Sequence, residues 1–178
     1  MRNKLIPLAA VMAFAVVLSG CSTSLSRSYT FNVDSGDSIK VTADLKKDVD
    51  IVLKNEGSGF DIVVKDQEPA DPEDTSHIIL EGSFDYGDAY DAWYETIEAD
   101  EMYSTLEEGT IGDNPYHFYD IGAGALWIQV KVGDTTVYLY SIKSVEETKA
   151  AFEALSFELV EGTSEADRSD PSPEPAAQ

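Results

Sequence analysis

The chain has 178 residues, enough for one domain with short appendages and a single hydrophobic core. Its 12 basic and 34 acidic side chains give a net charge of −22, and a surface of that sign repels nucleic acid, which argues against a nucleic-acid-binding role. Hydrophobic residues make up 43% of the chain and aromatic residues 10%, a composition that argues against a wholly disordered protein.

The N-terminal segment, residues 1–20, has the pattern of a secretory signal peptide. Arg2 and Lys4 are followed by an uncharged run from Leu5 to Leu18. As a helix this run would span about 21 Å at ~1.5 Å per residue. That is short of the ~30 Å hydrocarbon core of a bilayer, so we expect cleavage rather than a permanent membrane span.

The end of this segment, Leu18-Ser19-Gly20-Cys21, resembles the lipobox of bacterial lipoproteins. The resemblance implies that a diacylglycerol is attached to the Cys21 sulfur, that lipoprotein signal peptidase cleaves between Gly20 and Cys21, and that Cys21 becomes the mature N-terminus. An ordinary signal peptide with a cysteine near its end, or an uncleaved anchor, would also fit the pattern. Cys21 is the only cysteine in the chain, so no disulfide is available within the mature body.

Cleavage after Gly20 would leave a body that an anionic bilayer repels. It removes Arg2 and Lys4 from the 12 basic residues, leaving 10 against 34 acidic ones. The sequence contains no basic amphipathic segment to offset this charge, so only acyl chains would hold the body at the membrane. We therefore expect a lipid-anchored protein on the extracytoplasmic face of the cell membrane.

Composition divides the chain beyond residue 20 into three parts. Residues 21–28 are interpreted as the lipidated cysteine and a short polar tether. Residues 161–178 combine Pro, Ser, Glu and Ala without a large apolar side chain, which predicts a disordered acidic tail. Residues 29–160 remain as a single globular domain.

The first half of the domain alternates apolar and polar residues, as half-buried strands do. Short turns rich in Gly, Asp, Asn or Lys separate the alternating segments, which favours an antiparallel meander of four strands followed by a fifth. The five predicted strands are 29–33, 39–43, 49–53, 60–64 and 77–84.

The second half of the domain begins with a helical period. Tyr86, Tyr90, Trp93 and Ile97 recur on one side of an amphipathic helix and give it an aromatic face. Turn residues then punctuate the chain. Three further strands are predicted at 116–121, 125–132 and 135–142.

The final helix is predicted to begin at a capping box, Ser144-Val145-Glu146-Glu147. Val145, Thr148, Phe152 and Leu155 then share one face, and "FELV" closes the domain. Strands followed by a helix, twice over, predict an α+β fold: a mostly antiparallel sheet with two packed amphipathic helices. The alternative is a β-sandwich with peripheral helices.

Late strands rich in Tyr, Trp and Val, followed by "SVEETKAAFEALSFEL", resemble small lipoproteins of Gram-positive bacteria with a Mog1/PsbP-like α/β/α sandwich. The resemblance covers residues 78–160. It implies a binding or assembly factor and carries over no catalytic residues. The opening meander, 29–64, departs from the family pattern and fits the start of a β-sandwich instead.

The sequence offers few groups that indicate catalysis, so an enzyme ranks third, behind the two binding hypotheses given below. There is no G-x-S-x-G elbow, and "EGSGF" at 56–60 is interpreted as a hairpin turn. His77 and His117 lack the spacing of a zinc site. Acidic residues gather in 71–76 and 85–91, but without a D-x-D-x-D-G loop we interpret them as solvated surfaces rather than as a calcium site. The prediction is a protein that is not an enzyme and uses no cofactor or metal.

The aromatic side chains are the remaining binding candidates. In "ALWIQVKV" only one alternating set can face the main core, and the set formed by Trp127, Gln129 and Lys131 is the one with polar members. Trp127 with Tyr138 or Tyr140 is therefore our candidate surface patch, able to stack on sugar rings or to hold a protein partner. The expected function is a non-catalytic binding module for a cell-envelope protein or glycan. The alternative is a solute- or Ca²⁺-binding lipoprotein of the cell envelope.

Overall fold

The computed structural model describes residues 25–33, 38–54, 58–65, 71, 74–86, 89–100 and 102–160. Within these ranges the chain forms two antiparallel sheets and two helices. The expected signal segment with Gly20 and Cys21, and the expected tail, lie outside the described residues. No helix among the described residues is both long enough and apolar enough to cross a membrane.

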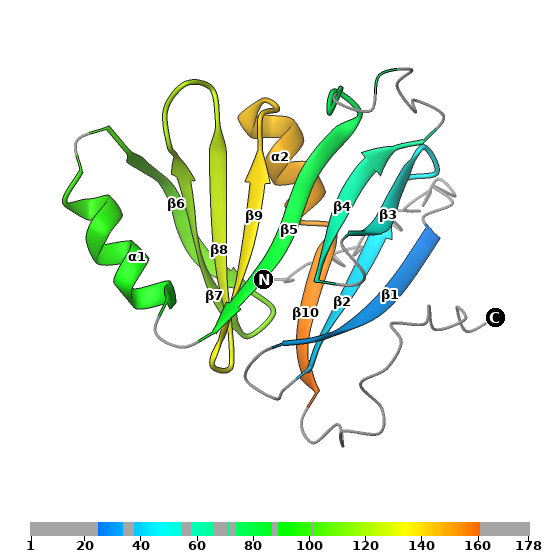
Figure 1. Cartoon of the computed structure of the whole chain (residues 1–178), viewed down its shortest axis with the longest axis horizontal. Coiled ribbons are helices and arrows are strands. Elements are labelled where there is room, and N and C mark those ends of the chain that lie inside the picture. Colours follow the sequence, from blue (N-terminus) through cyan, green and yellow to red (C-terminus); the bar gives the residue numbers. More distant parts are fainter. Residues whose placement is uncertain are drawn as a thin grey trace, which may run out of the picture.

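The larger sheet has seven strands in the order β3-β4-β5-β9-β8-β7-β6, and neighbouring strands are antiparallel (Figure 1). Residues of β8 alternate between its two faces: Leu126, Ile128 and Val130 are buried in the main core, while Trp127 points to the other face. The strands of this sheet are β3 (Val49–Lys54), β4 (Gly59–Val64), β5 (Ile78–Tyr86), β6 (Ser104–Ile111), β7 (Asn114–Asp120), β8 (Leu126–Val132) and β9 (Thr135–Ser141).

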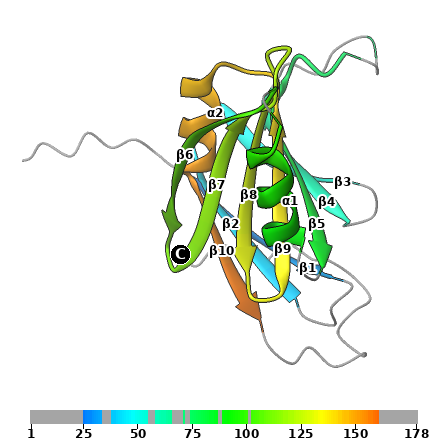
Figure 2. The ribbon, with the colours of Figure 1, turned by 90° about the vertical axis from the view of Figure 1, so that its left-hand side faces the viewer.

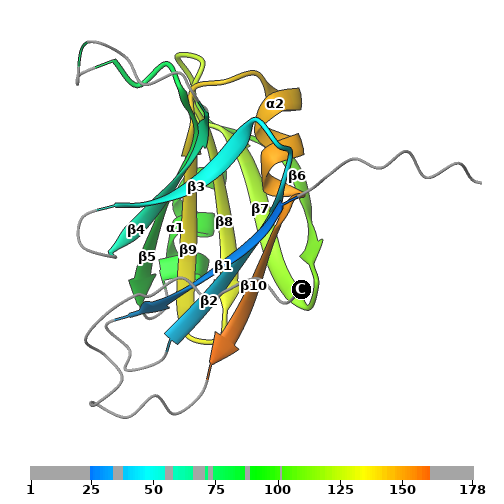
Figure 3. The same ribbon diagram turned by 90° about the vertical axis from the view of Figure 1, so that its right-hand side faces the viewer.

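The smaller sheet packs face to face against the larger one. Its strands are β1 (Leu25–Asn32), β2 (Ser38–Leu45) and β10 (Leu155–Val160), in the order β1-β2-β10. Figure 3 shows this sheet in front of the larger sheet. The ring of Phe31 lies 5.6 Å from that of Phe60 and 4.9 Å from that of Phe84, centroid to centroid. Apolar side chains from both sheets therefore form one core.

The two helices lie on opposite faces of the larger sheet. Helix α1 (Ala89–Glu98) lies over β8 and β9 on the face away from the core (Figure 2). Helix α2 (Val145–Phe152) is on the core side, where Phe152 meets Tyr116 edge-on at 4.8 Å. The predicted capping box is confirmed: Glu147 N–H donates to Ser144 Oγ at 3.3 Å, and Ser144 N–H donates to the Glu147 carboxylate at 3.4 Å.

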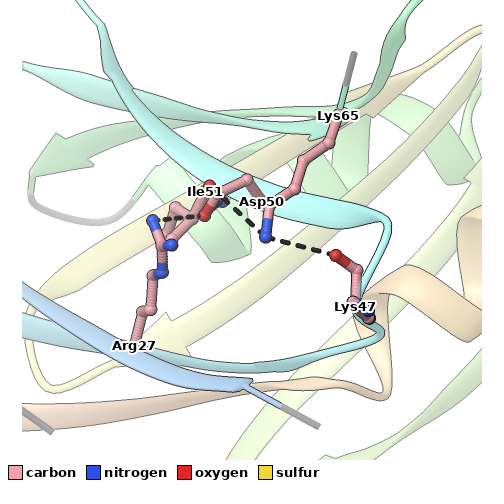
Figure 4. A network of polar contacts seen from close by, with 5 residues as sticks. All are labelled: Arg27, Lys47, Asp50, Ile51 and Lys65. Atoms are coloured by element: carbon pink, nitrogen blue, oxygen red, sulfur yellow. Dashed lines mark hydrogen bonds and ion pairs between the residues drawn. The ribbon is translucent and has the colours of Figure 1, made fainter. Parts of the chain in front are cut away.

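An ion-pair network joins the smaller sheet to the edge of the larger one (Figure 4). Arg27 of β1 lies 2.7 Å from Asp50 of β3, and Lys65 approaches the other Asp50 oxygen at 3.7 Å. Lys65 also donates to the main-chain carbonyl of Lys47 at 3.3 Å. The network therefore connects β1, an edge strand of the smaller sheet, with β3, an edge strand of the larger one.

The predicted class is confirmed in its coarse form: the fold is α+β, a mostly antiparallel and sandwich-like arrangement with two helices. The predicted four-stranded meander is wrong, because β2 pairs with β1 and β10 and not with β3. Val41 of β2 and Ile62 of β4 are both completely buried. The hairpin β1–β2 and the hairpin β3–β4 therefore both direct their apolar faces into one core, because the two sheets pack face to face.

Several smaller features also differ from the prediction. The sequence does not predict strand β6, since its residues are mostly exposed and Gly109 has the character of a turn residue. Tyr86, expected on the first helix, is the last residue of β5. Val145 is 46% exposed, so Ala151 rather than Val145 shares the buried face of α2, and Leu155 begins β10 instead of extending the helix. Strand β1 also begins inside the segment expected to be a tether.

Candidate binding site

The larger sheet carries a hollow of about 450 Å³ beside α1, on the face away from the core. Strands β3, β4, β5, β8 and β9 all contribute to its wall. This size falls within the ~300–1,000 Å³ range of small-ligand pockets. We name it the aromatic hollow, defined by Lys54, Glu81, Ser83, Trp127, Tyr138 and Tyr140.

Strand register sets the positions of these side chains. Tyr140 of β9 pairs with Glu81 of β5 on one side and with Trp127 of β8 on the other. Ser83 pairs in the same way with Tyr138. Directly paired residues share a sheet face with Cβ atoms about 4.5–5.5 Å apart, so the register brings side chains distant in sequence into one site.

The aromatic rings form one wall of the hollow. The Trp127 ring stacks on that of Tyr138 at 5.5 Å with an interplanar angle of 29°, and Trp93 of α1 meets Trp127 edge-on at 5.2 Å. Tyr140 is 37% exposed and Trp127 is half-buried, whereas Tyr138 is only 8% exposed. The structure therefore brings the three predicted aromatic residues together, with the accessible surface on Tyr140 and Trp127.

Charged side chains form the opposite wall. Lys54 donates a hydrogen bond to Glu81 and lies 3.3 Å from Asp61. Burial lowers the pKa of Lys54, but the bond to Glu81 and the charge of Asp61 outweigh it, so its pKa is raised overall. Burial raises the pKa of Asp61, and the charge of Lys54 offsets only part of that rise. Lys54 thus serves as the shared cation of two carboxylates.

Buried polar side chains continue from the aromatic wall toward α1. Gln129 pairs with Tyr138 across the strands and is completely buried. Neither polar atom of its amide, nor the Tyr138 hydroxyl, has a hydrogen-bond partner among the described residues. Burial raises the pKa of Tyr138 to about 12. Buried polar atoms in proteins nearly always have a hydrogen-bond partner. Within the described part of the chain the Gln129 amide and the Tyr138 hydroxyl are exceptions, so they have unused hydrogen-bonding capacity.

Helix α1 is seated on the same face by rings and one ion pair. The His117 ring lies 4.8 Å from that of Tyr90 and 4.4 Å from that of Tyr94. Lys131 pairs with Asp91 at 2.8 Å. Burial lowers the pKa of His117, and the carboxylates nearby oppose only part of this shift.

The sequence did not identify Lys54, Glu81 or Ser83 as members of the site. A usable signal existed, since Glu81 and Ser83 alternate with apolar residues in "HIILEGSF" and must share one face. The register that places this face beside Tyr140 is a non-local property. Trp93 was expected on the helix but not beside Trp127.

The two acidic segments considered for calcium are described only in part, since residues 72, 73, 87 and 88 lie outside the described residues. Asp74 is exposed and accepts the Ser76 N–H at 2.8 Å, as in a turn. Within the part of the chain that the structure describes, no three His, Cys, Asp or Glu side chains are grouped to hold a metal ion.

A second hollow, of about 490 Å³, lies between α2 and the turn that joins β2 to β3. Its apolar lining includes Leu45, Val49 and Ile79, and Lys46 and Lys143 also contribute to it. We name it the α2 hollow.

Comparison of the chain with protein-family models, with curated proteins and with solved structures finds no match.

Proposed function

We propose that this protein is a lipid-anchored, non-catalytic binding module on the extracytoplasmic face of the cell membrane, and that the aromatic hollow binds a component of the cell envelope. The observation that carries the proposal is the grouping of Trp127, Tyr138 and Tyr140 beside a charged wall in one accessible hollow. Large rigid rings supply contact area at low entropy cost, as binding sites require.

The location part of the proposal rests on the N-terminal sequence. Leu18-Ser19-Gly20-Cys21 resembles a lipobox, and the charge of the body gives it no attraction of its own to an anionic bilayer. Two acyl chains on Cys21 would anchor it stably, at ~0.8 kcal/mol per buried CH₂.

We also propose a Mog1/PsbP-like sandwich as the finer description of the fold. Its support is the placement of α1 and α2 on opposite faces of one antiparallel sheet. The smaller sheet formed by β1, β2 and β10 would then be an addition to that arrangement.

Anchoring is tested with Cys21→Ala in cells of the source bacterium. The variant should move from the membrane pellet to the soluble or secreted fraction, because no acyl chain can be attached. Mass analysis of the wild-type mature chain should show a lipidated residue 21 at the N-terminus. A variant that stays in the pellet would show that the anchor is elsewhere.

Binding is tested by co-sedimentation of the full chain with purified envelope fragments of the same bacterium. Tyr140→Ala should reduce retention, because it removes an accessible ring from the hollow. Leu106→Ala is the matched control, since Leu106 is 42% exposed but lies on β6 at the far edge of the sheet. Equal retention of both variants would contradict the proposed site.

A further inference from the structure

We infer that the aromatic hollow binds an uncharged sugar ring of an envelope glycan. This inference rests on the proposed function and specifies its ligand. It follows from how the hollow is divided, from its charge balance, and from the polar groups beside it.

The two walls of the hollow differ in chemistry. Rings from β8 and β9 form one wall, whereas Lys54, Glu81 and Ser83 of β3 and β5 form the other. A sugar ring is divided in the same way, with apolar C–H groups on its face and hydroxyls at its edge. The C–H face would stack on Tyr140 or Trp127 while the hydroxyls bond the polar wall.

The charge balance disfavours anionic ligands. Lys54 is already shared by Glu81 and Asp61, so it offers an anion little uncompensated positive charge. The net charge of −22 also repels anions. A neutral ligand with many hydroxyls avoids this penalty and can still accept from Lys54 and donate to Glu81.

Unused hydrogen-bonding capacity lies next to the rings. The Tyr138 hydroxyl and the Gln129 amide, both more than nine-tenths buried, have no partner among the described residues. Tyr138 lines the hollow and Gln129 does not, so the Tyr138 hydroxyl is the group that a ligand hydroxyl would approach. An aliphatic ligand could not bond it.

The chain contains two tryptophans, Trp93 and Trp127, and their rings lie 5.2 Å apart at the hollow. Intrinsic tryptophan fluorescence of the full chain therefore reports on this site. The probes are the neutral trisaccharides cellotriose, maltotriose and N,N′,N″-triacetylchitotriose, with trigalacturonate as the anionic comparison and choline as the cationic one. We expect a saturable change of emission with at least one neutral trisaccharide and none with trigalacturonate, which the net negative charge repels.

Variants then connect binding to the two walls. Tyr140→Ala should weaken trisaccharide binding at least tenfold, equivalent to about 1.4 kcal/mol. Glu81→Gln keeps the shape of the polar wall but removes its charged acceptor, and it should weaken binding as well. Leu106→Ala should bind as the wild type does. Circular dichroism of each variant confirms that the fold is kept.

The outcomes separate this inference from the function beneath it. If no neutral trisaccharide binds, or if choline or trigalacturonate binds better, the sugar inference is overturned. In that case Tyr140-dependent retention on envelope fragments would still uphold the proposed binding function. If no trisaccharide binds and retention on envelope fragments does not depend on Tyr140, the hollow is rejected as a binding site.

Discussion

Gly82, in the middle of β5, illustrates how closely a single position is constrained. A Cβ atom built at residue 82 would lie 2.3 Å from Cζ of Phe60, directly across the strand pair. Phe60 is completely buried, and its ring packs against those of Phe31 and Phe84. The aromatic ring covers the glycine and takes the place of its side chain.

Gly82→Ala should therefore destabilise the protein by about 1–3 kcal/mol, the range typical of an overpacked core. Urea unfolding followed by circular dichroism measures the change. Ser83→Ala, at the next residue and exposed, serves as the control and should leave the midpoint unchanged. An unaltered Gly82→Ala midpoint would mean that the Phe60 ring relocates freely.

At the residue scale the sequence predicted which face each β8 side chain takes. Leu126, Ile128 and Val130 lie in the core, as the alternation indicated. It could not predict that Gln129 is completely buried on the opposite face, because alternation specifies a direction and not what covers it. That cover is a helix from a distant part of the chain.

At the scale of elements, α1 packs against an imidazole, that of His117. The ring of His117 packs against Tyr90 and Tyr94, and burial is the main cause that lowers its pKa. Glu108, Glu98 and Asp91 act in the opposite direction without reversing the shift. Protonation of His117 would place a positive charge beneath α1.

Because the His117 pKa in the folded state is lower than in the unfolded chain, its contribution to stability is complete above about pH 6.5 and is lost as the pH falls through the folded pKa. The stability of the wild type should therefore fall between pH 7 and pH 5.5. His117→Phe keeps the ring and should show a smaller fall over this range. Thermal unfolding at the two pH values measures both, and parallel curves would exclude His117 as the cause.

Elements with local signals were the ones that the sequence predicted well. The capping box of α2 involves residues three apart, and the structure contains both of its hydrogen bonds. Strand β6 has no such signal, since its residues face mostly solvent and its stability derives from pairing with β7. The charged wall of the aromatic hollow was missed for a related reason, because Glu81 and Tyr140 meet only through strand register.

At the scale of the whole molecule, the sequence left the division into two sheets open, since it predicted one main sheet and gave a β-sandwich as the alternative. The hairpin β1–β2 could lie in the same sheet as the hairpin β3–β4 or in a separate sheet, and the alternation of apolar and polar residues fits both arrangements. Long-range contacts decide between the two arrangements, including the pairing of β2 with β10 from the end of the domain. The Arg27–Asp50 ion pair is a polar contact between the same two sheets.

Arg27→Gln should reduce the free energy of unfolding by no more than about 1 kcal/mol, because Arg27 is 38% exposed and such pairs are weak. The loss should shrink in ~1 M NaCl, where the Debye length is about 3 Å. A double-mutant cycle with Asp50→Asn, followed by urea unfolding at both salt concentrations, measures the coupling. A coupling that salt leaves unchanged would contradict a screened pair.

The register of β1 also determines how a protein anchored through Cys21 would be oriented relative to the membrane. Leu25 pairs with Leu45, which lines the α2 hollow, and Cys21 precedes Leu25 by four residues, at most ~14 Å of extended chain. Strand β3 runs from Val49 at that hollow to Lys54 at the aromatic one. Acyl chains on Cys21 would therefore hold the α2 end at the headgroups and turn the rings outward, toward wall polymers and away from lipid.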